Sequence, residues 1–241
     1  MNSCTVCNSH KLRLIDRAQS GENISDILEC LDCSAILNCA AYENLLNAGN
    51  REVDVQSTDF YNIESTSLSS LADEVTGNRR LLTSLCEIAA FDPLGKVFLD
   101  FGAGRGCAAV AARQIFRKST ALDYNTSLLQ STFERLDAND VRIITRLDDV
   151  DLPVDFVFAW HVLEHLPAPS EVLRKLFSVV RPNGVLCLQV PKYRAEYIFD
   201  AHFVFYNHFS LNAVLIDSGF RNIRLFDDFS NHFLTAIADR P

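Results

Sequence analysis

A short apolar run, followed by three glycines at alternate positions, limits the folds open to this chain. Residues 97–101 (VFLDF) have the apolar and aromatic character of a buried strand. Gly102, Gly104 and Gly106 come next, and the alanine-rich residues after them favour a helix. Glycines at a strand-to-helix turn allow a sharp change of direction and let the backbone approach a ligand closely. The stretch therefore predicts a ligand-binding turn at the carboxyl end of a strand.

The alternation of strand and helix continues to the end of the chain. A helical pattern starts at Leu68 and stops before Asp92 and Pro93, and a turn is expected at 181–184 (RPNG). Strands that alternate with helices predict βαβ units, and hence a doubly wound α/β fold with a mainly parallel sheet. Further strands are expected at 119–123, 141–145, 154–160, 185–190, 222–226 and 232–238, and helices near 106–117, 126–137, 169–180 and 210–217.

The charge of the chain argues against two kinds of partner. Its formal net charge is −9 at pH 7. Nucleic acids and anionic membranes attract patches of Lys and Arg, so we expect no nucleic-acid partner. The sequence has no apolar run long enough to span a membrane, and its N-terminus lacks the apolar stretch of a secretory signal. We expect a cytoplasmic protein, and the pattern sets no oligomeric state.

Four of the eight cysteines form two Cys-x-x-Cys pairs. Cys4 and Cys7 make the first pair, and Cys30 and Cys33 make the second. Two such pairs can surround one Zn²⁺ with four thiolates, and a site with four protein ligands is structural. Asn8 and Ser34 follow the pairs, where many zinc knuckles have glycine. The alternatives are a redox dithiol and a set of reduced cysteines without metal.

Charges near the glycines separate two classes of ligand. Asp100 lies ahead of the first glycine, and a carboxylate there suits an ammonium and a sulfonium better than a pyrophosphate. Cys107 stands where a dinucleotide-binding loop would have its third glycine. Asp123 ends the next strand, where a carboxylate can accept both ribose hydroxyls. These residues favour S-adenosylmethionine (SAM) over NAD. A NAD-dependent oxidoreductase and a purely structural turn are the alternatives.

Four motifs in order resemble the class I SAM-dependent methyltransferases, over residues 78 to 239. They are LDFGAGRG, ALDYN, DLPVDFVFAWHVLEHL and RPNGVLCLQVP. The resemblance implies a Rossmann-like, seven-stranded sheet whose last strand is antiparallel. It also implies a small-molecule methyl acceptor. A further alternative to an active enzyme is a module that binds SAM without catalysing methyl transfer.

Carried over residue by residue, the resemblance implies a cofactor site. The loop from Phe101 to Gly104 would hold the methionine moiety, and Asp123 the ribose. Tyr124 would flank the adenine, either Asp148 or Asp149 would meet its amino group, and Trp160 would line the pocket. The full set of expected cofactor-binding residues is Asp100, Phe101, Gly102, Ala103, Gly104, Asp123, Tyr124, Asp148, Asp149 and Trp160.

A second resemblance concerns the acceptor. Tyr206 and His208, in AHFVFYNHFS, resemble a Tyr-x-His-Phe-Ser run of zinc-bearing sugar methyltransferases. This makes His208 the expected general base, with Tyr206 or His165 orienting the acceptor. The alternatives are that His208 caps the next helix or packs among phenylalanines, and that the Glu164-His165 pair only fixes its loop by local hydrogen bonds.

The resemblances also imply a domain plan and a substrate class. We expect a zinc-ribbon-like module at 1–42, a linker and helical lead-in at 43–77, and a SAM-dependent methyltransferase domain at 78–241. A ribbon joined to a methyltransferase resembles enzymes of bacterial polysaccharide and deoxysugar pathways. The Asn/Asp-Pro-Pro-Tyr motif of amino-group methylation is missing after the fourth expected strand. The expected acceptor is therefore a hydroxyl or carbon of a sugar or related precursor.

Overall fold

The computed structural model describes residues 1–20, 23–47, 66–151 and 153–241, which divide into two compact units. The first unit comprises Met1–Val55, His161–Phe177 and Leu188–Ala238. The second comprises Gln56–Trp160, Ser178–Cys187 and Asp239–Pro241. The chain passes between the units several times, so neither is one continuous stretch of sequence. Residues 48–65 of the predicted linker lie outside the described residues.

A seven-stranded sheet has the strand order β10-β11-β8-β7-β4-β5-β6. Strand β4 pairs in parallel with β5 and β7, β5 pairs in parallel with β6, and the last strands are antiparallel. This topology confirms the predicted α/β, Rossmann-like fold class. The strands are β4 (Val97–Phe101), β5 (Lys118–Leu122), β6 (Arg142–Ile144), β7 (Val154–Trp160), β8 (Val180–Pro191), β10 (Arg221–Asp227) and β11 (Phe233–Asp239).

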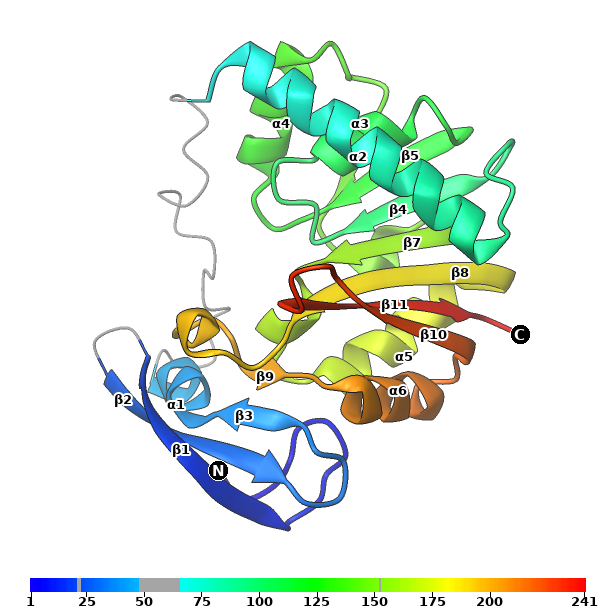
Figure 1. Ribbon diagram of the computed structural model, residues 1–241. Coiled ribbons are helices and arrows are strands. Elements are labelled where there is room, and N and C mark those ends of the chain that lie inside the picture. Colours follow the sequence, from blue (N-terminus) through cyan, green and yellow to red (C-terminus); the bar gives the residue numbers. More distant parts are fainter. Residues whose placement is uncertain (21–22, 48–65, 152) are drawn as a thin grey trace. The chain divides into compact units, whose positions relative to one another are not determined.

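The second unit packs helices against this sheet around a buried β4 (Figure 1). Helix α2 contacts α3, and α3 in turn contacts β4 and β5. The rings of Phe98 and Phe156 stack with centroids 6.0 Å apart, and Phe116 lies 5.0 Å from Phe98. Such aromatic contacts add to the apolar area that the strand buries. The helices are α2 (Leu68–Ala89), α3 (Cys107–Ala112) and α4 (Thr126–Arg135).

The ends of α2 follow from local chemistry. The Ser67 side chain accepts a hydrogen bond from the Ser70 N–H and caps the first turn. Ala90 adopts the left-handed conformation at the other end, and its N–H donates to the carbonyls of Cys86 and Glu87. The helix therefore covers the predicted range. Helix α3 is shorter than the predicted 106–117.

The predicted turn at 181–184 is wrong, because these residues belong to β8. The Asn183 N–H donates to the carbonyl of Arg240 at 2.7 Å, and the Arg240 N–H donates to Gly184 at 2.9 Å. A Cβ on Gly184 would lie 2.8 Å from the backbone oxygen of Arg181, so this position needs glycine. Pairing with the chain end, remote in sequence, overrides the local preference for a turn.

The first unit holds a four-stranded antiparallel sheet with the order β1-β2-β3-β9. Strands β1 (Leu12–Ser20) and β2 (Asn23–Cys30) form a hairpin, and β3 (Ile36–Asn38) pairs with β9 (Val204–Phe205). The fourth strand thus comes from the segment that the sequence placed in the 78–241 domain, and the boundaries at 42 and 77 stay a prediction.

The remaining helices are α1, α5 and α6. Helix α1 spans Cys39–Asn47, α5 spans Pro169–Val179 and α6 spans His208–Asp217. Three short 3₁₀ turns are η1 (Leu147–Asp149), η2 (Leu163–His165) and η3 (Ala195–Tyr197). Within the described ranges, none of the helices combines the length and apolar character needed to cross a membrane.

Gly106, the last glycine of the loop, has no room for a side chain. Its φ is +77°, and a Cβ there would lie 2.5 Å from Cε1 of Phe133 and 2.7 Å from Cδ2 of Leu129. We expect Gly106→Ala to lower the free energy of unfolding by about 2–4 kcal/mol, through backbone strain and overpacking. Urea denaturation measures the change.

Gly77 in α2 provides the matched control, because nothing lies within 4 Å of a Cβ built there. Gly77→Ala should raise the free energy of unfolding by about 0.5–1 kcal/mol, since alanine favours the helix. Equal effects of the two substitutions would contradict the packing argument for Gly106.

Candidate cofactor and metal sites

The glycine loop is fixed to the end of the neighbouring strand by backbone hydrogen bonds. The N–H groups of Gly102 and Ala103 both donate to the carbonyl of Leu122, at 2.9 and 3.0 Å. Gly102 and Gly104 have φ values of 71° and 54°, in the left-handed region that favours glycine. Phe101 is the last residue of β4. The expected methionine-binding stretch therefore forms one tight turn against β5.

Asp123 sits at the end of β5 and ties the loop to that strand. Its Oδ2 accepts the Gly104 N–H at 2.8 Å, and its Oδ1 accepts the Asn125 N–H at 3.0 Å. The residue is 4% exposed. Parallel pairing of β4 and β5 brings together residues that are 19 apart in sequence. Tyr124, which follows, is largely exposed.

Asp100 is buried behind the loop. Its Oδ2 accepts the N–H of Ala109 in α3 at 3.0 Å. Burial raises the pKa of this carboxyl to about 7; the Ala109 hydrogen bond opposes the rise and the charge of Asp123 adds to it. Asp100 thus contacts α3. The interaction of Asp100 with a charged ligand stays a prediction.

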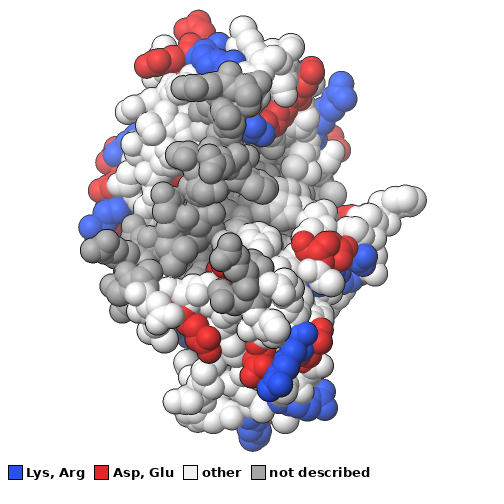
Figure 2. Space-filling model, turned by 90° about the vertical axis from the view of Figure 1, so that its left-hand side faces the viewer, with Lys and Arg blue, Asp and Glu red and all other residues white. Residues whose placement is uncertain are grey.

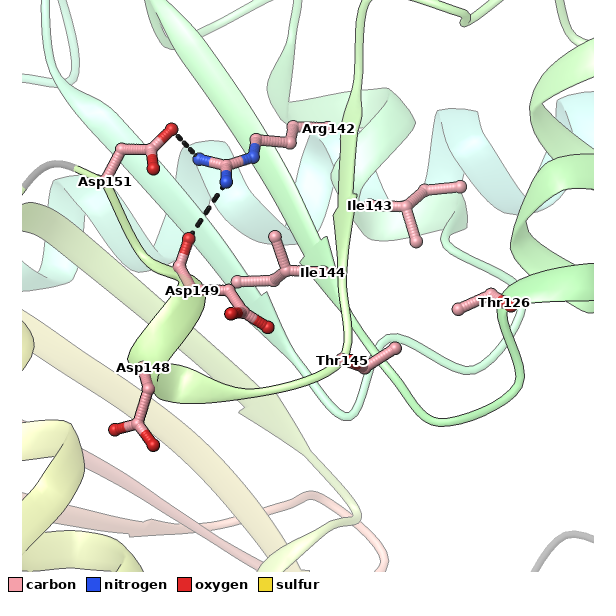
Figure 3. A pocket seen from close by; sticks show the side chains of 8 residues that line it. All are labelled: Thr126, Arg142, Ile143, Ile144, Thr145, Asp148, Asp149 and Asp151. Atoms are coloured by element: carbon pink, nitrogen blue, oxygen red, sulfur yellow. Dashed lines mark hydrogen bonds and ion pairs between the residues drawn. The ribbon is translucent and has the colours of Figure 1, made fainter.

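A cavity of about 470 Å³ lies beside β6 and η1 (Figure 3). Both candidates for the adenine contact, Asp148 and Asp149, line it. In Figure 3 the Asp149 carboxylate points in among the lining side chains, whereas that of Asp148 points away. Asp148 also pairs with Arg146 at 3.3 Å. The geometry therefore favours Asp149 in the choice that the sequence left open. The lining residues are Thr126, Arg142, Ile143, Ile144, Thr145, Asp148, Asp149 and Asp151.

Trp160 ends β7 and is half-buried. Its ring stacks on that of Phe158, with centroids 4.8 Å apart and planes 8° from parallel. The indole orientation is thus held by a buried neighbour on the same strand.

The four paired cysteines converge in the first unit. The Sγ atoms of Cys4 and Cys33 are 3.6 Å apart, and those of Cys7 and Cys30 are 3.5 Å apart. All four sulfurs lie within 4.8 Å of one another. Tetrahedral Zn²⁺ with Zn–S bonds of about 2.3 Å requires sulfurs roughly 3.8 Å apart. The donor set and its spacing therefore fit one zinc ion.

The backbone around the cysteines has the form of two matching knuckles. Asn8 donates its N–H to the Cys4 carbonyl, and Ser34 donates to the Cys30 carbonyl, both at 2.8 Å. Both residues have left-handed φ values, 61° for Asn8 and 59° for Ser34. These are the positions at which many zinc knuckles have glycine. The hydrogen bond between Cys33 and Cys4 lowers the pKa of the Cys4 thiol to about 5 and raises the pKa of the Cys33 thiol, so Cys4 is the member of this pair that becomes a thiolate first. A lowered pKa favours the thiolate that binds metal.

The three candidate catalytic residues have different surroundings in the first unit. His208 is exposed, and its Nε2 lies 3.5 Å from Oδ2 of Asp227. Tyr206 is buried, and its hydroxyl has no hydrogen-bond partner among the described residues. Asn207, not His208, caps α6, so the helix-cap alternative for His208 is wrong. Nδ1 of His165 lies 2.9 Å from the Ala201 carbonyl oxygen. This hydrogen bond agrees with the alternative in which His165 only fixes its loop.

A family model described as a methyltransferase domain matches residues 76–225, which is more than half of the chain. The chain belongs to this methyltransferase family. The family implies SAM as the methyl donor. Its match covers the glycine loop, Asp123, the η1 carboxylates and Trp160.

Two curated relatives and one solved structure are similar to this methyltransferase. A probable S-adenosylmethionine-dependent methyltransferase of Mycolicibacterium smegmatis is 29% identical over 99 residues, which are 40% of this chain and 38% of that protein. The ubiquinone biosynthesis O-methyltransferase of Xanthomonas axonopodis pathovar citri is 25% identical over 155 residues, 58% of this chain and 65% of that protein. The chain thus spans less than two thirds of the length of these relatives.

The similar structure is that of a SAM-dependent methyltransferase from Aquifex aeolicus. It has a TM-score of 0.57 and 18% identity, and the match covers 73% of this chain and all of that one. At this identity the likeness shows the fold alone.

The structure brings His165 together with two residues that the sequence did not place among the catalytic, cofactor-binding or metal-binding residues. Glu164 is fully buried, and His202 is 5% exposed. Burial lowers the pKa of His202 to about 4, so its imidazole is neutral at pH 7. The segment WHVLEHL held one signal, a carboxylate directly before a histidine. His202 lies in a phenylalanine-rich stretch without any spacing signal.

The raised pKa of Asp100 makes the stability of the methyltransferase depend on pH. Between about pH 4 and pH 7 the folded state keeps this proton and the unfolded state loses it, so the contribution of Asp100 to stability falls as pH rises. Asp100→Asn keeps an oxygen for the Ala109 N–H and removes the titration. We expect the variant to gain stability over wild type as pH rises through this window, as measured by urea denaturation. A constant difference between the two proteins would contradict the assignment.

Proposed function

We propose that this protein transfers a methyl group from SAM to a hydroxyl or carbon of a small molecule, such as a sugar or polysaccharide precursor. The observation that carries the proposal is the turn formed by Gly102–Gly104, fixed to Asp123 at the adjoining ends of β4 and β5. Open α/β sheets bind ligands outside the carboxyl ends of their strands. The family match supports the same class of reaction.

Several residues of the second unit support SAM as the cofactor. Bound SAM supplies a methyl group on a positively charged sulfonium. The glycine turn leaves its backbone without side-chain bulk, so a ligand can approach it closely. Asp123 offers carboxylate oxygens to ribose hydroxyls, and the cavity beside η1 offers Asp149 to the adenine amino group. Trp160 offers an indole face held by Phe158.

Asp123 is the residue whose change tests the cofactor proposal. We expect S-adenosylhomocysteine to bind the protein in calorimetric titration, and NADH not to bind. Asp123→Asn keeps an acceptor for the Gly104 N–H and removes the anion. The variant should bind about 10- to 100-fold more weakly, as expected for loss of charge-assisted hydrogen bonds.

Asp140→Asn is the control, because Asp140 is an exposed carboxylate of the same unit that pairs with Arg113. It should bind like wild type. Binding of NADH in place of S-adenosylhomocysteine would favour the oxidoreductase alternative, and equal affinity of wild type and Asp123→Asn would remove Asp123 from the site.

The first unit offers residues for the acceptor. His208 is our candidate for the general base, because it is an exposed imidazole whose Nε2 lies 3.5 Å from Oδ2 of Asp227, a carboxylate that can orient the ring. Tyr206 and His165 are the candidates for orienting the acceptor. Figure 2 shows acidic and basic side chains interspersed on the face in view, without a basic stripe among the described residues. This supports a small molecule rather than a nucleic acid.

His208→Ala tests the base. Transfer of labelled methyl from SAM to a panel of nucleoside diphosphate sugars identifies an acceptor. We expect the variant to lose at least about 100-fold in turnover while keeping its affinity for S-adenosylhomocysteine. His10→Ala, at another exposed histidine, is the control. Full turnover in His208→Ala would refute its role, and cofactor binding without transfer to any acceptor would favour a non-catalytic SAM-binding module.

We further propose that Cys4, Cys7, Cys30 and Cys33 hold a structural Zn²⁺. The spacing of the sulfurs and the two matching knuckles support the proposal. Four thiolates leave no position for water or substrate, so this zinc would act on the fold of the ribbon and not on the reaction.

A further inference from the structure

Glu164 presents a charge that the first unit leaves without a hydrogen-bond donor. Its side chain is fully buried, and neither carboxylate oxygen has a hydrogen-bond partner among the described residues. The nearest basic atoms to Oε1 are Nδ1 of His161 at 3.5 Å and Nε2 of His165 at 3.9 Å. A buried carboxylate is stable only when it is paired with a cation or protonated. A cation beside the Glu164 carboxylate would meet this requirement.

Two histidines beside Glu164 each use Nδ1 as a donor, which leaves Nε2 as an acceptor. Nδ1 of His165 lies 2.9 Å from the Ala201 carbonyl, and Nδ1 of His202 lies 2.7 Å from the Tyr197 carbonyl. A carbonyl oxygen only accepts hydrogen bonds, so both Nδ1 atoms carry the proton. Each Nε2 then presents a lone pair. Histidines that bind metals are usually held in this way, by a backbone carbonyl at the other ring nitrogen.

The backbone brings the three side chains together from two distant segments. The Phe203 N–H donates to the Glu164 carbonyl at 2.8 Å, which places residue 202 beside η2. The rings of His165 and His202 have centroids 4.6 Å apart. One ligand atom each from Glu164, His165 and His202 lies within 4.8 Å of the other two.

We propose that Glu164, His165 and His202 bind a divalent transition-metal ion of the Zn²⁺ class, at a site separate in its ligands from the four cysteines. Two imidazoles and one carboxylate are a donor set that suits zinc and its neighbours in the first transition row, and disfavours Mg²⁺ and Ca²⁺. Metal–ligand bonds of about 2.0–2.2 Å place tetrahedral ligand atoms roughly 3.4 Å apart, so each pair of these atoms would have to approach by roughly 1.4 Å or less. Three protein ligands leave a position open for an oxygen ligand.

The surroundings of the cluster suit a metal that enters from one side. The ring of Phe199 lies 3.9 Å from that of His202, and Phe205 lies 5.7 Å from it, so aromatic rings cover the His202 side. His165 is partly exposed, and Phe199 is 39% exposed. His161 stays next to Oε1 of Glu164 as an outer partner of the carboxylate.

Cobalt titration of the full-length, metal-free protein tests the site. Co²⁺ bound by thiolates gives strong charge-transfer absorption in the near ultraviolet, whereas Co²⁺ bound by imidazole and carboxylate gives only weak visible bands. We expect the protein to bind two equivalents of Co²⁺, one with the thiolate absorption and one with the weak visible bands. We also expect proton NMR of the cobalt protein to show two strongly shifted, exchangeable imidazole N–H signals, because the four-cysteine site contains no histidine.

Two near-isosteric variants identify the ligands. His202→Asn keeps an N–H donor for the Tyr197 carbonyl and removes Nε2, and Glu164→Gln keeps the shape of the side chain and removes its charge. Each should lose the equivalent with weak bands and keep the thiolate equivalent. His208→Asn makes the same change at an exposed histidine outside the cluster and should keep both. Circular dichroism and the thiolate band show that each variant is folded.

Four results would overturn the proposal. The first is that wild type binds cobalt only at the thiolate site. The second is that no shifted imidazole signals are seen at saturation. Displacement of the weak-band cobalt by millimolar Mg²⁺ would mean a site of oxygen ligands elsewhere. A weak-band equivalent that persists in both His202→Asn and Glu164→Gln would likewise exclude these ligands.

Discussion

The hydrogen bond from the Gly104 N–H to the Asp123 carboxylate is the contact on which the cofactor half of this protein depends. It joins the turn after β4 to the end of β5, and the Leu122 carbonyl adds two further bonds to the same turn. Because the donors are backbone groups, the turn can be held without side chains that would fill the ligand space. The buried carboxylate therefore serves the fold, and in our proposal it also serves the ribose.

Packing around the glycine turn restricts the residues that can form it. Gly106 needs a left-handed backbone, and Phe133 and Leu129 of α4 occupy the space of its missing Cβ. Asp100 stabilises the first turn of α3 from below the loop. These constraints leave the glycine turn one conformation, which is what preorganised binding of a ligand requires. The cost is a buried carboxyl group with a raised pKa.

The first unit has a different organisation, in which hydrogen bonds from side chains to backbone carbonyls fix short segments to one another. Asn38 donates to the carbonyl of Phe199, Asn207 donates to that of Ser34, and Ser170 donates to that of Val6. Each bond links the cysteine-bearing segment to a part of the chain more than 150 residues away. In our proposals, the four cysteines and the Glu164 cluster would each bind a metal ion.

The amino-acid sequence by itself determined the α/β class, the glycine turn, the place of Asp123 at the end of the next strand and the two cysteine knuckles. These features rest on local chemistry: glycine where φ is positive, a carboxylate at a strand end, and Cys-x-x-Cys turns. Only the tertiary structure decided that residues 181–184 extend a strand, that β9 completes the sheet of the cysteine segment, and that His202 meets Glu164 and His165. Those outcomes depend on hydrogen bonds between residues remote in sequence, such as Asn183 with Arg240 and Phe203 with Glu164, and local spacing carries no record of them.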